Sequence, residues 1–148
     1  MDWYALTDDI LLHEPDRVVT RHRLDADDPF FRDHFPGRPV LPGVLATEAL
    51  VQAGRVLLAG HVEQADRWVL ASARAVRFTS FLSPGQWLVC EVKLLGVEDG
   101  LARLAATGRS CDTDEIEPVE LGSLPTALSG RLELRVPRFG PTWNPQGP

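Results

Sequence analysis

The strongest constraint on the fold is an apolar segment at residues 44–59, which reads VLATEALVQAGRVLLA. It contains no proline, a single glycine and many residues that favour helix. Its apolar residues fall on nearly every side of a helix, which is typical of a helix enclosed by the rest of its domain. The sequence therefore predicts one long central helix at residues 44–59.

Strand-like segments surround this helix. Residues 17–24 alternate in polarity, and the segments 68–78, 86–95 and 101–110 are separated by Pro- and Gly-containing turns. Residues 116–124 are expected to add an edge strand, because Pro118 cannot donate to a central ladder. Residues 131–136 alternate as well and form either a strand or an arm.

One helix among consecutive strands predicts an α+β domain in which an antiparallel sheet surrounds the helix. The expected boundaries are a single domain at residues 1–136 and a Pro/Gly-rich tail at 137–148 that is poorly ordered. A length of 148 residues is sufficient for one hydrophobic core.

The composition excludes several classes of protein. A net charge of -6 argues against nonspecific nucleic-acid binding. Charged and polar residues interrupt every apolar stretch, so no membrane span is expected, and the acidic N-terminus lacks the basic region of a signal peptide. Cys90 and Cys111 form no metal-type pair, and two reduced thiols in a cytoplasmic protein are the expectation.

Three polar residues interrupt the apolar helix. Glu48, Gln52 and Arg55 are spaced i, i+4 and i+7, which places them on one stripe. A carboxylate on an enclosed helix must be neutral, paired or directed into a cavity. Pairing of Glu48 with Arg55, or with an arginine elsewhere, is one interpretation, and a role at a reaction site is the other.

The stretch HFPGRPVLPGVLATEALVQ at residues 34–52 closely resembles the catalytic segment of the β-hydroxyacyl-acyl carrier protein dehydratases, which have the hot-dog fold. The matching positions are His34, Phe35, Pro36, Pro39, Val40, Leu41, Pro42, Gly43, Val44, Leu45, Glu48, Ala49, Leu50 and Gln52. A second stretch at residues 76–95 is similar to the strand, turn and strand that follow the helix in that family.

This resemblance implies dehydration of (3R)-3-hydroxyacyl-acyl carrier protein to the trans-2-enoyl product in fatty acid biosynthesis, without a cofactor or metal. His34 would remove a proton from C2, and Glu48 would protonate or orient the leaving hydroxyl. The N–H groups of Gly43 and Val44, at the helix start, would hold the thioester oxygen. Gln52 would hold the Glu48 carboxyl by a hydrogen bond. Glutamate at position 48 resembles the branch that dehydrates without isomerising.

The resemblance also suggests a substrate tunnel lined by Phe35, Pro42, Arg55, Phe78 and Phe81. The family favours small residues around position 55. An arginine there either crosses the tunnel and restricts it to short or polar-ended acyl chains, or leaves the tunnel open by extending into solvent or pairing with an acidic residue such as Glu63.

The implied partners are an acyl carrier protein and a second copy of the chain. In the family, the histidine and the acid of one site come from different subunits of a homodimer, and further assembly into a trimer of dimers is left open. Basic side chains near the active loop would steer the acidic carrier; these are Arg32, Arg38, Arg74 and Arg77.

Other functions remain as alternatives. Asp33 and Arg55 differ from the residues that the family usually has at these positions. They leave open a dehydratase that acts on a polyketide or other specialised acyl thioester. A hot-dog thioesterase is less favoured, because those enzymes lack the histidine motif, and a noncatalytic acyl-binding protein has no need of both His34 and Glu48. A metal site built from Asp33, His34 and Glu48 matches no common ligand spacing.

Overall fold

The computed structural model describes residues 5–31 and 37–137 of the chain. The described part contains six strands, one α-helix and three short 3₁₀ segments. In chain order these are β1 (Asp9–Glu14), β2 (Arg17–Arg23), η1 (Pro29–Phe31), α1 (Gly43–Leu58), η2 (Ala65–Arg67), β3 (Val69–Phe78), β4 (Trp87–Glu98), β5 (Leu101–Cys111), η3 (Pro118–Ser123) and β6 (Thr126–Arg135).

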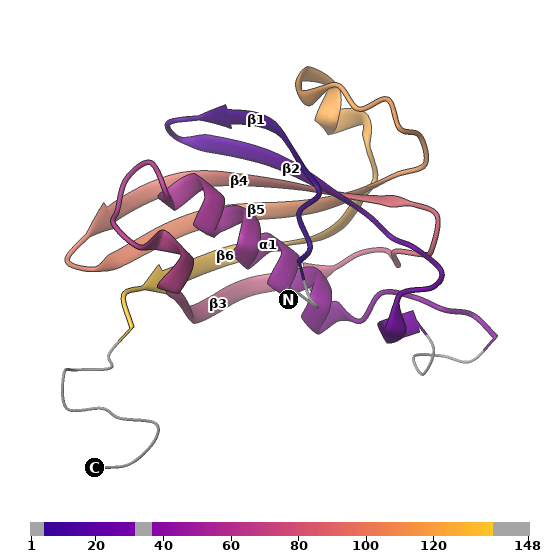
Figure 1. Ribbon diagram of the computed structural model, residues 1–148, viewed down its shortest axis with the longest axis horizontal. Coiled ribbons are helices and arrows are strands. Elements are labelled where there is room, and N and C mark those ends of the chain that lie inside the picture. The colour runs from indigo at the N-terminus through magenta and orange to yellow at the C-terminus, as the bar shows by residue number, and fades with distance from the viewer. Residues whose placement is uncertain (1–4, 32–36, 138–148) are drawn as a thin grey trace, which may run out of the picture.

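The strands form one antiparallel sheet in the order β1-β2-β4-β5-β6-β3. The helix α1 lies across one face of this sheet (Figure 1). Strand β3 follows α1 in the chain but occupies the far edge of the sheet, next to β6. This arrangement confirms the predicted α+β class and the antiparallel sheet around one helix.

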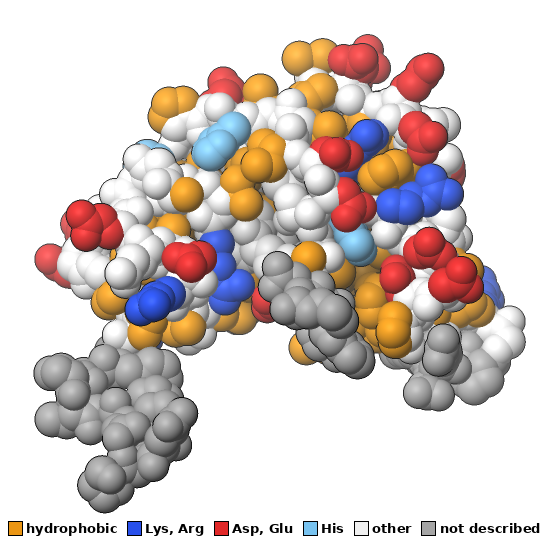
Figure 2. Space-filling view, viewed as in Figure 1, with side chains coloured by type: hydrophobic (Ala, Val, Ile, Leu, Met, Phe, Trp, Pro, Cys, Tyr) orange, Lys and Arg blue, Asp and Glu red, His pale blue; other side chains and the backbone are white. Residues whose placement is uncertain are grey.

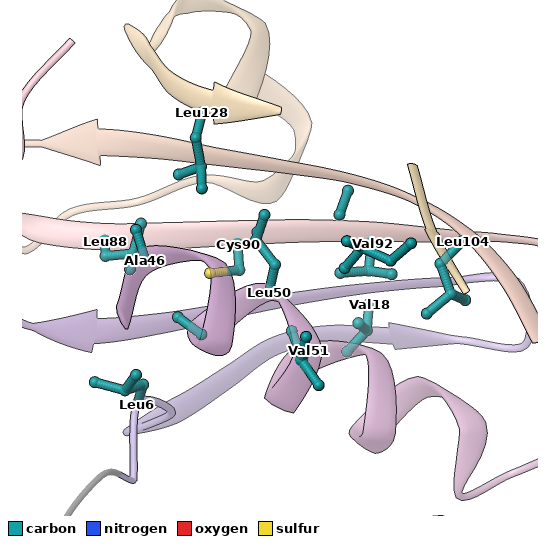
Figure 3. Packing of buried hydrophobic residues seen from close by; sticks show 14 of the residues in the cluster. Leu6, Val18, Ala46, Leu50, Val51, Leu88, Cys90, Val92, Leu104 and Leu128 are labelled. Atoms are coloured by element: carbon teal, nitrogen blue, oxygen red, sulfur yellow. The ribbon is translucent and has the colours of Figure 1, made fainter. Parts of the chain in front are cut away.

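Small side chains bring α1 close to the sheet. Ala46, Ala49 and Ala53 are buried and are spaced as successive turns of one helix face, together with Leu50 and Leu57. Figure 3 shows Ala46 and Leu50 of the helix beside Leu88 and Cys90 of β4, and Val51 beside Val18 of β2. This packing forms the main hydrophobic core and fixes which face of α1 points away from the sheet.

The opposite face of α1 is less covered than the sequence suggested. Val44 is 76% exposed, and the side chain of Glu48 is 39% exposed. The apolar pattern correctly predicts a helix, which spans residues 43–58. It overstates how far the face with Glu48 is buried in a single chain, because only the face toward the sheet is packed.

The strands predicted around residues 17–24, 68–78, 86–95 and 101–110 are all present. The expected edge strand at 116–124 is wrong, because Pro118 begins the 3₁₀ segment η3 instead. Residues 131–136 belong to a longer strand, β6, between β5 and β3 rather than to an arm. Strand β1 was not predicted, since its alternation is weak and it lies at the sheet edge.

The face of the sheet opposite α1 has a small second core. Val19, Val89 and Cys111 are buried there beneath Leu121 of η3. Glu91 on the same face accepts from Arg17 Nε at 2.6 Å and lies 3.7 Å from Arg109 Nη2. Arg17 and Arg109 also donate to main-chain oxygens of η3. These bonds hold η3, which was predicted as a strand, over the second core.

Gly108 lies at a crowded position of β5 and provides a test of the core packing. A Cβ at this position would lie 2.4 Å from Leu128 Cδ2 and 3.3 Å from Leu88 Cδ1. We expect Gly108→Ala to lower the free energy of unfolding by about 1–3 kcal/mol, the usual range for overpacking. The matched control is Gly122→Ala in η3, where a Cβ would meet no atom within 4 Å. Urea denaturation measures both, and equal stability of the two variants would contradict the packing.

Candidate active site

The N-terminal end of α1 borders a cavity of about 290 Å³. Gly43 lines it, and the ring of Phe78 lies so close that a Cβ on Gly43 would be 3.0 Å from Phe78 Cε1. Phe81 lines the same cavity, together with Leu41 and Leu82, whose main chains are joined by a hydrogen bond of 2.7 Å. Two of the predicted tunnel residues, Phe78 and Phe81, therefore meet the predicted thioester-binding glycine.

The first turn of α1 carries no side-chain cap. Pro42 occupies the N-cap position, and its carbonyl accepts from the N–H groups of Leu45 and Ala46. The N–H groups at the start of a helix have no acceptor within the helix, and its dipole is positive at this end. The end of α1 beside the cavity is therefore suited to an oxygen that gains negative charge.

Glu48 lies one and a half turns into α1, on the face that the sheet leaves open. Its Oε1 accepts from Gln52 Nε2 at 3.3 Å and forms an ion pair with Arg55 Nη1 at 3.5 Å. The carboxylate is therefore paired and partly accessible to solvent at once. The predicted contact between Gln52 and Glu48 is confirmed, and so is the alternative in which Glu48 pairs with Arg55.

Gln52 ties the helix to the N-terminal segment. Its Oε1 accepts from the backbone N–H of Leu6 at 2.7 Å while its amide nitrogen donates to Glu48. Leu6 is 1% exposed, so this bond is shielded from water. The orientation of the Glu48 carboxyl thus depends on a segment more than forty residues earlier in the chain. No sequence pattern indicates this dependence, because the group that Gln52 binds there is a backbone N–H.

Arg55 is held from two sides. Its Nε donates to the carbonyl of Trp68 at 2.8 Å, and its Nη1 faces Glu48. The side chain is 26% exposed. Pairing with Glu63, one of the alternatives at the sequence level, is not what the structure shows: the partner is Glu48, and the carbonyl of Trp68 was not anticipated.

His34, Phe35 and Asp33 lie outside the described residues, as does Arg32 and the tail from residue 138. The structure therefore groups the other predicted site residues into two sets along α1. Gly43, Phe78 and Phe81 meet at the N-terminal cavity, with Pro42 and Val44 beside Gly43. Glu48, Gln52 and Arg55 form a hydrogen-bonded row that follows it.

The thiol of Cys90 contributes no reactive group at this site. Cys90 is 1% exposed in the core beneath α1, and burial raises the pKa of its thiol to about 12. A thiol with so high a pKa is not a nucleophile near neutral pH. Among the residues that the structure describes, no group of three or more His, Cys, Asp or Glu side chains is arranged to hold a metal ion.

Surface charge is consistent with the acidic composition. In the view of Figure 2, Asp and Glu side chains lie toward both ends of this face, and Lys and Arg side chains form small separate groups. Within the described ranges, no helix has the length and apolar character needed to cross a membrane.

Solved structures with the same architecture identify the fold. The dehydratase heterocomplex ApeI:P from Xenorhabdus doucetiae aligns with a TM-score of 0.68, over 93% of this chain and 86% of that one, at 20% identity. The zebra fish thioesterase superfamily member 2 aligns with a TM-score of 0.63, over 87% of this chain and 80% of that one, at 12% identity. At such identities the likeness shows the fold alone, which is the hot-dog fold.

Sequence comparison specifies the family. A model of the FabA-like domain matches residues 11–116. The protein named 3-hydroxyacyl-acyl-carrier-protein dehydratase FabZ from Chloroflexus aggregans is 37% identical over 111 residues, which cover 74% of this chain and 77% of that protein. The protein of the same name from Deinococcus radiodurans is 36% identical over 100 residues, 68% of this chain and 69% of that one. The chain belongs to the FabA-like dehydratase family, as the motif at residues 34–52 predicted.

The bridge made by Gln52 can be tested without any assumption about function. Gln52→Leu removes the acceptor of the shielded Leu6 N–H, and a buried donor left unpaired typically costs about 1–3 kcal/mol. We expect a loss of stability of that size and faster hydrogen exchange at the Leu6 amide, with little change in the amides of β4 and β5. Nuclear magnetic resonance gives the exchange rates. Unchanged protection of Leu6 would show that the bridge does not hold the segment.

Proposed function

We propose that this protein dehydrates (3R)-3-hydroxyacyl-acyl carrier protein to the trans-2-enoyl product in fatty acid biosynthesis. The observation that carries the proposal is family membership over residues 11–116, with relatives at 36–39% identity that are named as this dehydratase. The chain itself contributes Glu48 on the open face of α1 and a cavity at the start of the same helix.

The reaction needs a base, an acid and a site for negative charge. In our proposal neutral His34 removes the proton from C2, while charge develops on the thioester oxygen at the N–H groups of Gly43 and Val44. The C2–C3 double bond forms as the C3–O bond breaks. The hydroxyl leaves as water with a proton that Glu48 supplies directly or through a water molecule. Gln52 and Arg55 hold the Glu48 carboxyl in place for this transfer.

The proposed assembly is a homodimer in which each site combines His34 of one subunit with Glu48 of the other. Its support is the exposed edge of the sheet. Along β3, the apolar residues Val69, Leu70 and Phe78 are 37%, 40% and 57% exposed. An edge strand with apolar side chains is suited to pairing with another strand. Phe78 also lines the cavity at α1, so a second copy on this edge would lie next to the site.

The proposed partner is an acyl carrier protein whose acyl chain enters from the end of the site near Gly43. Arg38, Arg74 and Arg77 are exposed, and Arg74 has 77% of its side chain accessible although it lies 3.6 Å from Glu133. Such side chains speed encounter with an acidic partner even on a protein of negative net charge. We place the reaction in the cytoplasm, since both cysteines are free thiols.

The experiment that tests the proposal distinguishes dehydration from thioester hydrolysis. Purified protein is mixed with a 3-hydroxyacyl thioester, and two signals are followed: the absorbance of the conjugated enoyl thioester, and release of free thiol. Dehydration gives only the first signal. Release of thiol without enoyl product would instead assign the protein to the hot-dog thioesterases, which share this fold.

The catalytic pair gives a first kinetic prediction. His34→Ala and Glu48→Gln should each lower kcat by about 10²–10⁴-fold, the usual contribution of a general acid or base. Matched controls are His13→Ala and Glu117→Gln, because both residues are exposed, neither belongs to α1 and neither lines its cavity. The controls should retain wild-type rates. Near-normal turnover in either His34→Ala or Glu48→Gln would remove that residue from the mechanism.

A second prediction concerns the shared site. Mixing His34→Ala with Glu48→Gln under conditions that exchange subunits should restore activity, because a heterodimer has one site with both residues intact. At random exchange half of the dimers are mixed, so recovery should approach a quarter of the wild-type rate. Mixing either variant with itself is the control. A monomer in sedimentation at working concentration, or no recovery after proven exchange, would contradict the assembly.

A further inference from the structure

In the proposed chemistry Arg55 helps to position Glu48, but its guanidinium has more N–H donors than that contact uses. Its guanidinium is fixed between the carbonyl of Trp68, 2.8 Å from Nε, and the carboxylate of Glu48, 3.5 Å from Nη1. Two anchors on different elements leave it little freedom, so its charge stays at one place beside Glu48.

A hollow of about 460 Å³ opens next to this guanidinium. It lies between the C-terminal half of α1 and residues 62–66. Its walls combine the apolar side chains of Val56, Ala59 and Val62 with the polar ones of Gln52, Arg55 and Asp66. A hollow with both kinds of side chain is not suited to a purely saturated chain.

The orientation of a bound acyl chain follows from the proposed function, on which this inference rests. The thioester oxygen lies at Gly43 and the carbon that loses its hydroxyl lies at Glu48, so the chain runs from the start of α1 toward its end. Carbons beyond C3 must next pass Arg55. Its Nη1 is only 3.5 Å from the Glu48 carboxylate, so a chain reaches the guanidinium within a few carbons of C3.

We propose that Arg55 determines substrate specificity: the protein accepts 3-hydroxyacyl chains that are short or carry an oxygen acceptor just beyond C3, and it rejects long saturated chains. A methylene run placed against the guanidinium would take water from a charge and offer no hydrogen bond in return. An oxygen acceptor would receive a bond from the guanidinium, whose five N–H donors exceed the two acceptors that Trp68 and Glu48 provide.

The test compares kcat/KM for five thioesters: 3-hydroxybutanoyl, 3-hydroxyhexanoyl, 3,5-dihydroxyhexanoyl, 3-hydroxyglutaryl and 3-hydroxytetradecanoyl. The wild type should favour the four-carbon chain over the fourteen-carbon one by at least about tenfold. It should also favour the 3,5-dihydroxy chain over 3-hydroxyhexanoyl, which has the same length. The 3-hydroxyglutaryl thioester carries a charged oxygen acceptor, and the 3,5-dihydroxyhexanoyl thioester carries a neutral one. A preference for either of them over 3-hydroxyhexanoyl supports the inference.

Arg55→Ala should reverse this profile. Relative to the four-carbon chain, kcat/KM for long chains should rise by about fourfold for each methylene newly accommodated, which corresponds to the usual gain of burying one methylene. The preference for the oxygenated chains should disappear. The matched control is Arg67→Ala, since Arg67 is an exposed arginine at the end of the neighbouring η2 segment and lines neither hollow. The control should keep the wild-type profile.

The outcomes separate the two levels of the proposal. A wild type that dehydrates the four-carbon thioester but prefers long saturated chains, or that favours neither oxygenated chain over 3-hydroxyhexanoyl, overturns the role of Arg55 and leaves the proposed function intact. An unchanged profile in folded Arg55→Ala overturns it as well. If no thioester is dehydrated by the wild type, the proposed function fails and the inference fails with it. The wild-type profile gives this answer even if Arg55→Ala does not fold.

Discussion

The close contact between α1 and the sheet is the constraint on which the rest of the structure depends. Alanines at positions 46, 49 and 53 and a glycine at 54 face the strands, and a Cβ on Gly54 would lie 2.8 Å from Leu104 Cδ1. Larger side chains would lift the helix off the sheet. Because this face is fixed so firmly, the opposite face with Glu48 has one defined orientation relative to the strands.

The orientation of Glu48 is then refined by its neighbours on the same helix. Gln52 and Arg55 both contact Oε1, and each is anchored elsewhere: Gln52 at Leu6 and Arg55 at Trp68. Three segments that are distant in sequence therefore meet at one carboxylate. A carboxylate supported in this way loses less entropy on adopting one fixed geometry than a free side chain would.

The helix also separates two environments. Its N-terminal end borders an apolar cavity with Gly43 and Phe78, and its C-terminal half borders a mixed hollow at Arg55. Glu48 lies between them. A substrate that extends along α1 would meet backbone N–H groups first, then a carboxylate and then a guanidinium. In the proposed function, the reaction and the choice of substrate would both depend on the order of these groups along one helix.

The sequence by itself determined the helix, most strands and the row of polar residues, because helical spacing and strand alternation are local properties. It also carried the motif from His34 to Gln52, which identifies the family. It failed for β1 and η3, where short segments with weak alternation take their form from what they cover.

Only the tertiary structure decided which groups hold Glu48 and Arg55. The sequence offered Glu63 as a partner for Arg55, yet the guanidinium binds the carbonyl of Trp68 and faces Glu48. The partner of a long side chain depends on which groups the packed elements bring close to it. Every residue has a backbone carbonyl, so the sequence does not indicate which carbonyl will accept a hydrogen bond.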